Sequence, residues 1–122
     1  LHLSIRRAAS DVYKRQGQVD CIFCNIAAGK FGTEIIAQND SAIAFRDINP
    51  LAKVHILVVP KKHTPAVSAL TDEKDLVGLF ALIREVAANF TDGQYRLQFN
   101  SGEKEGQTVF HTHAHVLSGR AV

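Results

Sequence analysis

Short apolar runs separated by polar breaks make up the chain between residues 21 and 47. Residues 21–28 (CIFCNIAA) stop at Gly29, a pattern typical of a short helix that is closed by glycine. Two extended runs, 33–38 (TEIIAQ) and 42–47 (AIAFRD), flank the turn signal Asn-Asp-Ser. This arrangement predicts a β-hairpin.

A buried strand and one long helix are expected next. Residues 54–60 (VHILVVP) are almost all apolar and β-branched, which predicts a buried strand that ends at Pro60. Beyond it, Thr71 is a candidate helix cap followed by acidic residues in the first turn. Apolar positions then recur at spacings of three and four and predict the buried face of a helix: Leu76, Leu79, Phe80, Ile83, Val86, Ala87 and Phe90.

Two more strands complete the expected order of elements. Residues 95–99 (YRLQF) alternate, residues 100–106 form a polar loop with glycines, and residues 109–117 (VFHTHAHVL) predict a second long strand. Hairpin, strand, helix, strand and strand together indicate an α+β fold.

Length and composition predict one domain. The chain has 122 residues, 46% of them hydrophobic, which is enough for a core of its own. Residues 1–16 lack sustained periodicity and are expected to be a disordered or non-native tail, which leaves residues 17–122 as the domain.

Charge and hydropathy narrow the classes of partner. The net charge of +2, from 14 basic and 12 acidic residues, gives no argument for binding nucleic acid. No apolar run approaches the roughly 18 residues that cross a bilayer. The start lacks the apolar centre of a secretory signal, so we expect a cytoplasmic protein without a nucleic-acid or membrane partner.

Three histidines, His111, His113 and His115, occupy alternate positions in the last predicted strand, where they would share one face. Isolated histidines on strands are usually solvated or hydrogen-bonded. A metal site is a second interpretation, but the first and third positions are roughly 13 Å apart, so only two of the three could bind one ion. The third interpretation is covalent catalysis, in which a neutral imidazole attacks phosphorus.

Four blocks in order resemble one family. They are AFRDINP (44–50), VHILVVPKKH (54–63), FNSGEKEGQ (99–107) and GQTVFHTHAHVL (106–117), and the resemblance to the histidine triad (HIT) superfamily, in its Hint-like branch, covers about residues 20–120. It implies a HIT-like α+β fold: an antiparallel sheet with one long helix and a short amino-terminal helix. It also implies a homodimer formed through the helix and a strand.

The resemblance also implies a reaction. His113 would attack the α-phosphorus of a purine nucleoside 5′-phosphoramidate or acyl nucleotide, and His115 would contact the phosphate and leaving group. His55 and His111 would complete the four active-site histidines. The implied substrate-binding residues are Phe45, Asp47, Ile48, Asn100, Gly106, Gln107, Thr108 and His115. Without the resemblance, Asp47 and Asn100 read equally well as turn residues and His55 as a satisfied core histidine.

The cysteine pair has the spacing of half a zinc site, although two thiols can also be small core residues. The resemblance implies a structural zinc ion, with no cofactor needed for the chemistry itself. Its implied ligands are Cys21, Cys24, His63 and His111. A redox role for the pair is a weaker alternative, because the βαβ context is absent.

Two further functions remain open from the sequence. One is a nucleotide-binding regulatory protein with little turnover, and the other is a dinucleoside polyphosphate hydrolase.

Overall fold

The computed structural model describes residues 21–119, so the tail predicted at 1–16 lies outside the described residues. Within that range, five strands form one antiparallel sheet in the order β1-β2-β3-β5-β4. The strands are β1 (Ala37–Gln38), β2 (Ala42–Arg46), β3 (Val54–Pro60), β4 (Arg96–Phe99) and β5 (Ala114–Ser118). The helices are α2 (Ile22–Ala27) and α3 (Glu73–Phe90), with 3₁₀ turns η1 (Val67–Ala69) and η2 (Glu103–Glu105). The expected α+β fold with an antiparallel sheet and one long helix is confirmed.

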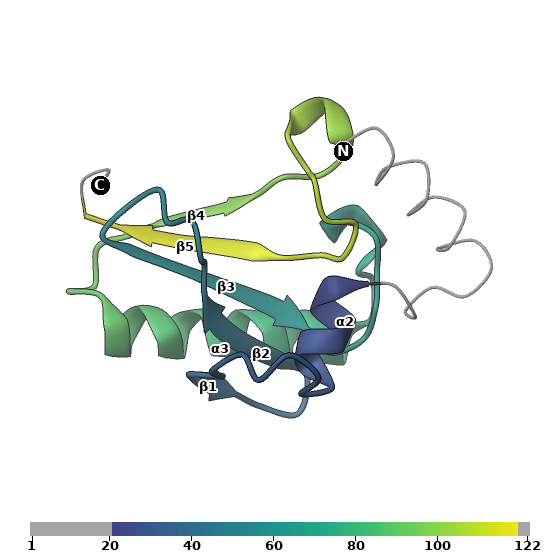
Figure 1. Cartoon of the computed structure of the whole chain (residues 1–122), viewed down its shortest axis with the longest axis horizontal. Helices are drawn as coiled ribbons and strands as arrows, with labels where there is room; N and C mark the ends of the chain where they lie inside the picture. The colour runs from purple at the N-terminus through teal and green to yellow at the C-terminus, as the bar shows by residue number, and fades with distance from the viewer. Residues whose placement is uncertain (1–20, 120–122) are drawn as a thin grey trace.

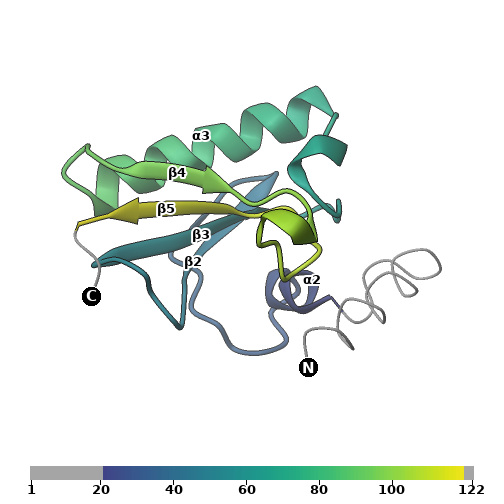
Figure 2. The ribbon, with the colours of Figure 1, turned by 90° about the horizontal axis from the view of Figure 1, so that it is seen from above.

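The two helices cover opposite faces of the sheet (Figures 1 and 2). Alternation along each strand sends successive side chains to opposite faces, so each strand supplies both layers. The layer under α3 is made of Ala42, Ala44, Ile56, Val58, Leu70, Leu79, Leu82, Ile83, Val86, Ala114 and Val116. The layer beside α2 is made of Phe23, Ile26, Ile43, Phe45, Leu57 and Val59.

The same alternation places two histidines on the face away from α3. His55 lies between the α3-facing Val54 and Ile56 of β3, so its side chain takes the α2 side. His115 pairs with Leu57, another residue of the α2 layer. The strand register therefore puts His55 and His115 on one face before any polar contact is considered.

The long helix begins one residue later than the sequence predicted. The predicted cap, Thr71, is wrong, because the Asp72 side chain accepts hydrogen bonds from the backbone N–H of Lys74 (2.9 Å) and of Asp75 (3.3 Å). A second difference concerns the buried face. Phe80 is 41% exposed and packs against Phe99 instead, at 6.1 Å between ring centroids, while Leu82 is fully buried.

Two predicted strands are shorter than expected. The hairpin forms, but its first strand shrinks from 33–38 to Ala37–Gln38. The strand predicted for 109–117 begins only at Ala114. The reason is that the backbone N–H of Thr112 donates to the carbonyl of Thr64 (2.8 Å), outside the ladder between β3 and β5. Strict strand alternation thus does not apply to His111 and His113.

None of the helices within residues 21–119 combines the length and the apolar character that crossing a bilayer requires.

Candidate active site and metal centre

Seven titratable side chains gather into two neighbouring groups. The first, which we call the Cys/His cluster, consists of Cys21, Cys24, His63 and His111. The second, the histidine chain, consists of Asp47, His55 and His115. His113 lies beside both, because its Nδ1 reaches the backbone of His111 and its ring lies 4.9 Å from that of His115. The five histidines that the sequence singled out therefore lie in one region: His55, His63, His111, His113 and His115.

Ligand atoms in the Cys/His cluster converge. The Nδ1 atom of His111 lies 3.3 Å from Sγ of Cys21 and 3.3 Å from Sγ of Cys24. The Nδ1 atom of His63 lies 3.3 Å from Sγ of Cys24. The four ligand atoms all lie within 4.8 Å of one another. These separations suit a tetrahedral zinc site, in which bonds of about 2.3 Å to sulfur and about 2.1 Å to nitrogen put the two atoms roughly 3.6 Å apart.

Local structure brings these residues together. Cys21 is the N-cap of α2, and its Sγ accepts a hydrogen bond from the backbone N–H of Cys24 (3.4 Å), so the helix turn holds both sulfurs on one side. Thr112 links the two histidine segments, because its hydroxyl lies 2.7 Å from the Thr64 hydroxyl in addition to the backbone bond. His63 and His111 consequently meet edge to face, with ring centroids 5.0 Å apart.

The donor set fits a metal because the tautomer of His111 is fixed by the backbone. Its Nε2–H donates to the carbonyl oxygen of Pro60 (2.7 Å). The lone pair of neutral His111 is therefore on Nδ1, the atom that faces both sulfurs. Burial lowers the pKa of His111 to about 4, which keeps the ring neutral. Burial, then the neighbouring Cys21, raises the pKa of Cys24 to about 12, so a metal would have to displace the thiol proton.

The histidine chain has a fixed direction. The backbone N–H of Leu51 donates to Nδ1 of His55 (3.0 Å), so in neutral His55 the proton is on Nε2. That Nε2 lies 2.9 Å from Nδ1 of His115. Because Nδ1 of His115 accepts this bond, its own proton is on Nε2. Three donors thus follow one another: Leu51 N–H, His55 Nε2–H and His115 Nε2–H.

This direction makes the histidine chain a poor metal site, although its ligand atoms are close. A metal on Nε2 of His55 would require the proton to move to Nδ1, where it would face the Leu51 N–H. The backbone hydrogen bonds therefore favour metal binding in the Cys/His cluster and oppose it in the histidine chain. In the Cys/His cluster the lone pair points toward the sulfurs, whereas in the histidine chain the corresponding atom carries a proton.

His113 has the lone pair on the opposite ring nitrogen from His111. Its Nδ1 lies 2.8 Å from the carbonyl oxygen of His111, which can only accept, so neutral His113 has its lone pair on Nε2. Burial lowers the pKa of His113, and the hydrogen bond to His111 and the charge of Asp47 oppose that shift only partly. The ring also packs edge-on against Phe23, at 5.0 Å between centroids. A neutral, oriented imidazole results.

The imidazoles of His115 and His55 also favour the neutral form. Burial, followed by the proximity of His113 and His55, lowers the pKa of His115 to about 4. Burial lowers the pKa of His55, while the carboxylate of Asp47, 3.5 Å from its Nε2, acts in the opposite direction.

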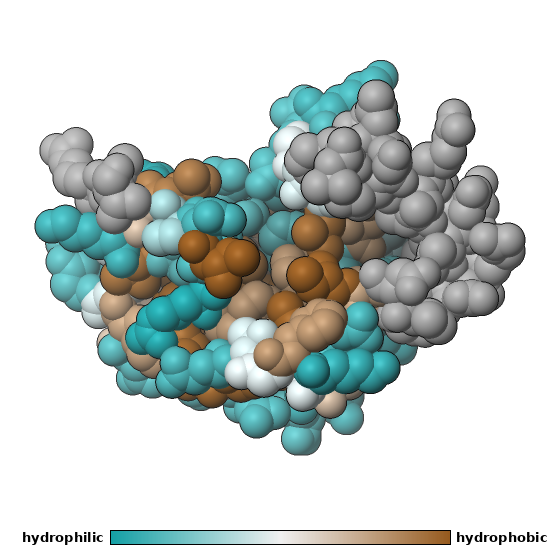
Figure 3. Space-filling view, in the orientation of Figure 1, coloured by the Kyte–Doolittle hydropathy of each residue, from teal (hydrophilic) through white to brown (hydrophobic). Residues whose placement is uncertain are grey.

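Hydrophobic side chains predicted to lie beside a substrate occupy two different positions. Phe45 is buried and packs against Phe23, at 5.7 Å between ring centroids. Ile48 is 91% exposed on the turn after β2. Hydrophobic surface gathers at the centre of the face drawn in Figure 3, in front of the sheet. Ile48 therefore offers apolar surface to a ligand, while Phe45 supports the wall beneath.

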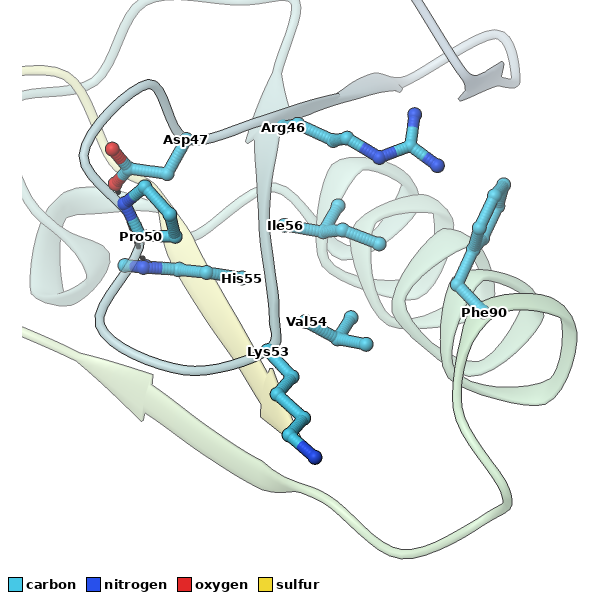
Figure 4. A pocket seen from close by; sticks show the side chains of 8 residues that line it. All are labelled: Arg46, Asp47, Pro50, Lys53, Val54, His55, Ile56 and Phe90. Carbon is cyan, nitrogen blue, oxygen red and sulfur yellow. Dashed lines mark ion pairs between the residues drawn. The ribbon is translucent and has the colours of Figure 1, made fainter. Parts of the chain in front are cut away.

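A pocket of about 250 Å³ opens at the turn between β2 and β3, lined by Arg46, Asp47, Pro50, Lys53, Val54, His55, Ile56 and Phe90. Figure 4 shows Asp47, Pro50 and His55 on one side of β3, and Val54 and Ile56 on the side of α3. The Arg46 guanidinium lies over the Phe90 ring, 5.3 Å from its centroid. Most of this pocket thus belongs to the α3 side and not to the histidines.

The loop after β4 is organised by its own side chains. Asn100 donates to the carbonyl of Glu105 (2.7 Å), and Gly106 adopts a left-handed conformation with φ of +91°. Gln107 is buried: it accepts from the backbone N–H of Gly102 (2.8 Å) and donates to the carbonyls of Pro65 and Val109. Its side chain therefore shapes the loop, and Thr108 is left exposed.

The profile of the HIT domain family matches residues 29–122 of the chain. The chain belongs to the HIT family. A HIT-like protein of Synechocystis, described as uncharacterized, is 45% identical over 104 residues, which cover 83% of this chain and 91% of that protein.

Solved HIT structures agree with the fold. A HIT family hydrolase from Clostridium thermocellum superposes with a TM-score of 0.77 at 35% identity, covering 83% of this chain and 91% of that one. A histidine triad protein from Clostridium difficile gives a TM-score of 0.75 at 39% identity, covering 85% and 94%. The family profile covers His63 and His111 but not Cys21 and Cys24, which precede residue 29.

Sequence reasoning missed three contributors to the site of this HIT domain. Phe23 touches the rings of both His111 and His113, and its position between the two cysteines was the available signal. The carbonyl of Pro60 and the N–H of Leu51 fix two tautomers. Backbone groups of this kind leave no mark in the sequence.

Proposed function

We propose that this HIT protein is a hydrolase that cleaves purine nucleoside 5′-phosphoramidates or acyl nucleotides, with His113 as the nucleophile. The observation that carries the proposal is the 2.8 Å contact from Nδ1 of His113 to the carbonyl oxygen of His111. It orients the ring and leaves Nε2 with the lone pair. The names of HIT family hydrolases among the similar structures support the reaction class.

In the proposed reaction, Nε2 of His113 attacks the α-phosphorus and the bond to the leaving group breaks. The adduct places positive charge on the ring, and the Nδ1–H bond to the His111 carbonyl stabilises that charge. Water then attacks the same phosphorus and releases the nucleoside monophosphate and neutral His113. The lowered pKa of His113 keeps the attacking nitrogen unprotonated near neutral pH.

Other residues bind and polarise the substrate in this proposal. His115 offers its Nε2–H to a phosphoryl oxygen, since its Nδ1 is already occupied by His55. Asp47 accepts hydrogen bonds from the ribose hydroxyls, Ile48 lies beside the base, and the buried Phe45 supports the wall beneath it. Asn100, Gly106, Gln107 and Thr108 form the loop next to the phosphate.

We propose that the Cys/His cluster holds a structural zinc ion through Cys21, Cys24, His63 and His111. All four ligand positions would come from the protein, which is the arrangement of a closed structural site. The ion would fix the His111 segment, whose backbone carbonyl orients His113. The chemistry itself would need no cofactor.

We also propose that the protein pairs with a second copy through β4 and α3. β4 is an edge strand of the sheet, and an exposed edge can pair with another chain. Exposed hydrophobic residues on these two elements support the same surface: Val77, Phe80 and Leu97, with Tyr95 just before β4.

The test is release of nucleoside monophosphate from a fluorogenic adenosine 5′-phosphoramidate by the parent and by His113→Asn. Asparagine can keep the donor to the His111 carbonyl while removing the nucleophilic nitrogen, so it is a matched control for ring orientation. We expect release to fall on the order of 10³-fold or more, as when a nucleophile is removed. His113→Ala should behave the same way.

Other outcomes separate the remaining functions. A parent that binds AMP tightly but releases no product would instead be a nucleotide-binding protein. Faster cleavage of a dinucleoside polyphosphate than of the phosphoramidate would mean that the proposed substrate class is wrong, while His113 would remain the proposed nucleophile. Full activity in His113→Asn would refute the assignment of the nucleophile.

A further inference from the structure

Asp47 connects two structural features through its two carboxylate oxygens. Oδ1 accepts a hydrogen bond from the backbone N–H of Asn49 (2.8 Å), which closes the turn after β2. Oδ2 lies 3.5 Å from Nε2 of His55, the contact marked by a dashed line in Figure 4. The Asp47 side chain is 20% exposed, whereas that of His55 is only 1% exposed. Asp47 therefore borders solvent on one side and the histidine chain on the other.

The proton on Nε2 of His55 faces two acceptors. One is Nδ1 of His115 at 2.9 Å, and the other is Oδ2 of Asp47 at 3.5 Å. His55 cannot offer a second proton, because its Nδ1 accepts the Leu51 N–H. The neutral nitrogen of His115 and the charged carboxylate of Asp47 thus compete for the same N–H donor.

We propose that Asp47 is a positioning residue that couples recognition of the ribose hydroxyls to the hydrogen-bond donor that His115 presents to the phosphoryl group. The inference rests on the proposed function, which places the ribose at Asp47 and the phosphate beside His115.

Competition for Oδ2 is the physical basis of the coupling. Ribose hydroxyls donating to Oδ2 satisfy the carboxylate and reduce its attraction for the His55 proton. That proton is then committed to Nδ1 of His115. His115 is held in the tautomer whose Nε2–H faces outward from the chain, and the donor bonds polarise one another in sequence.

The electrostatic surroundings are consistent with this path. Burial lowers the pKa of His55 and of His115, and the charge of Asp47 opposes that shift at both rings. A change in how Asp47 is hydrogen-bonded therefore reaches both rings. Arg46, on the adjacent backbone position, does not interfere, because its guanidinium lies over Phe90 on the α3 side.

Coupling between two subsites must be reciprocal, so it appears in binding alone. We would measure, by titration calorimetry, the affinities of four probes: AMP, 2′,3′-dideoxy-AMP, adenosine and 2′,3′-dideoxyadenosine. Removing the hydroxyls should weaken AMP binding roughly fivefold or more beyond its effect on adenosine. In Asp47→Asn and in Asp47→Ala that excess should disappear.

A second readout reports on the ring itself. Nitrogen-15 spectra of histidine-labelled protein distinguish the Nδ1–H from the Nε2–H tautomer. AMP should shift the His55 and His115 resonances toward a more complete Nε2–H form of His115, and 2′,3′-dideoxy-AMP should shift them less. A simple ribose-binding role for Asp47 would leave this difference at zero.

The outcomes separate this inference from the proposed function. Equal hydroxyl effects on AMP and adenosine would overturn the coupling even if the protein hydrolyses phosphoramidates. A clear excess in the parent, lost in both Asp47 variants, would support the coupling even if no turnover is found. Absence of AMP binding to the folded protein would overturn both.

Discussion

His113 donates its Nδ1–H to the carbonyl of His111, while the ring of His111 turns the other way toward the two cysteines. Two residues separated by one position thus belong to different groups. The backbone of His111 serves the nucleophile proposed at His113, and its side chain serves the Cys/His cluster. Loss of a metal from that cluster should consequently disturb the orientation of His113.

Cys24→Ser should abolish metal binding and lower nucleotide release. Cys24 touches both histidines of the Cys/His cluster, and among residues 21–119 that cluster holds four ligands, so the substitution removes one of the four. We expect zinc content measured by atomic emission to fall to near zero, and activity to fall roughly tenfold or more through His111.

His115→Gln is the matched control for that experiment, because it alters the histidine chain without touching the Cys/His cluster. It should keep its zinc while losing activity. Full zinc occupancy in Cys24→Ser would contradict the proposed ligand set.

Stability should fall with acidification through His115. Its pKa is lowered from 6.5 to about 4 in the folded protein, so the unfolded chain binds more protons between these values. The free energy of unfolding contributed by neutral His115 is present above pH 6.5 and is lost as the pH falls toward 4. Urea midpoints measured across that window should fall less in His115→Gln than in the parent, at equal metal loading. Parallel pH profiles would refute this origin.

Gly78→Ala should destabilise the protein although alanine favours helices. A Cβ at Gly78 would overlap Cβ and Oγ of Ser41, where α3 crosses the hairpin. Overpacking costs about 1–3 kcal/mol, which outweighs the gain of about 1 kcal/mol in helix propensity. Denaturant unfolding should show a net loss in the single variant.

The double variant Ser41→Gly with Gly78→Ala tests the cause of that loss. Removing the Ser41 side chain clears the space, so the double variant should be more stable than expected from adding the two single effects. Additive losses would mean that the contact with Ser41 is not the cause.

Leu97→Arg should weaken the proposed dimer. Leu97 is 38% exposed on the edge strand β4, and a charge there would be buried against a second copy. Light scattering should show a dimer for the parent and a larger monomer fraction for the variant. Lys104→Ala, on η2, is the control and should leave the mass unchanged. A monomeric parent would refute the interface.

The helix over 73–90 shows what the local sequence pattern can and cannot predict. Spacings of three and four located α3, because an amphipathic helix must bury one stripe. The exact cap was missed because Thr71 and Asp72 are both good capping residues and adjacent. Phe80 was assigned to the core, yet it faces Phe99 beside β4. Which flank of the stripe is covered depends on the neighbouring strand.

The histidines show the same division at the site. Family resemblance in four ordered blocks brought together His55, His113 and His115, and the structure places them side by side. The expected alternation from His111 onward did not hold, because the strand starts at Ala114. Hydrogen bonds to Thr64 and Pro60, distant in sequence, redirect that segment.

The sequence alone determined the local elements, the α+β order and the residue types available for the chemistry, because short-range periodicity and turn residues encode them directly. The family resemblance grouped Cys21 with His111, 90 positions apart, but only the tertiary structure decided which nitrogen of each imidazole carries the proton. Those outcomes depend on backbone carbonyls and N–H groups that every residue possesses. Their positions are set by the packing of the whole chain, and not by any side chain that a sequence displays.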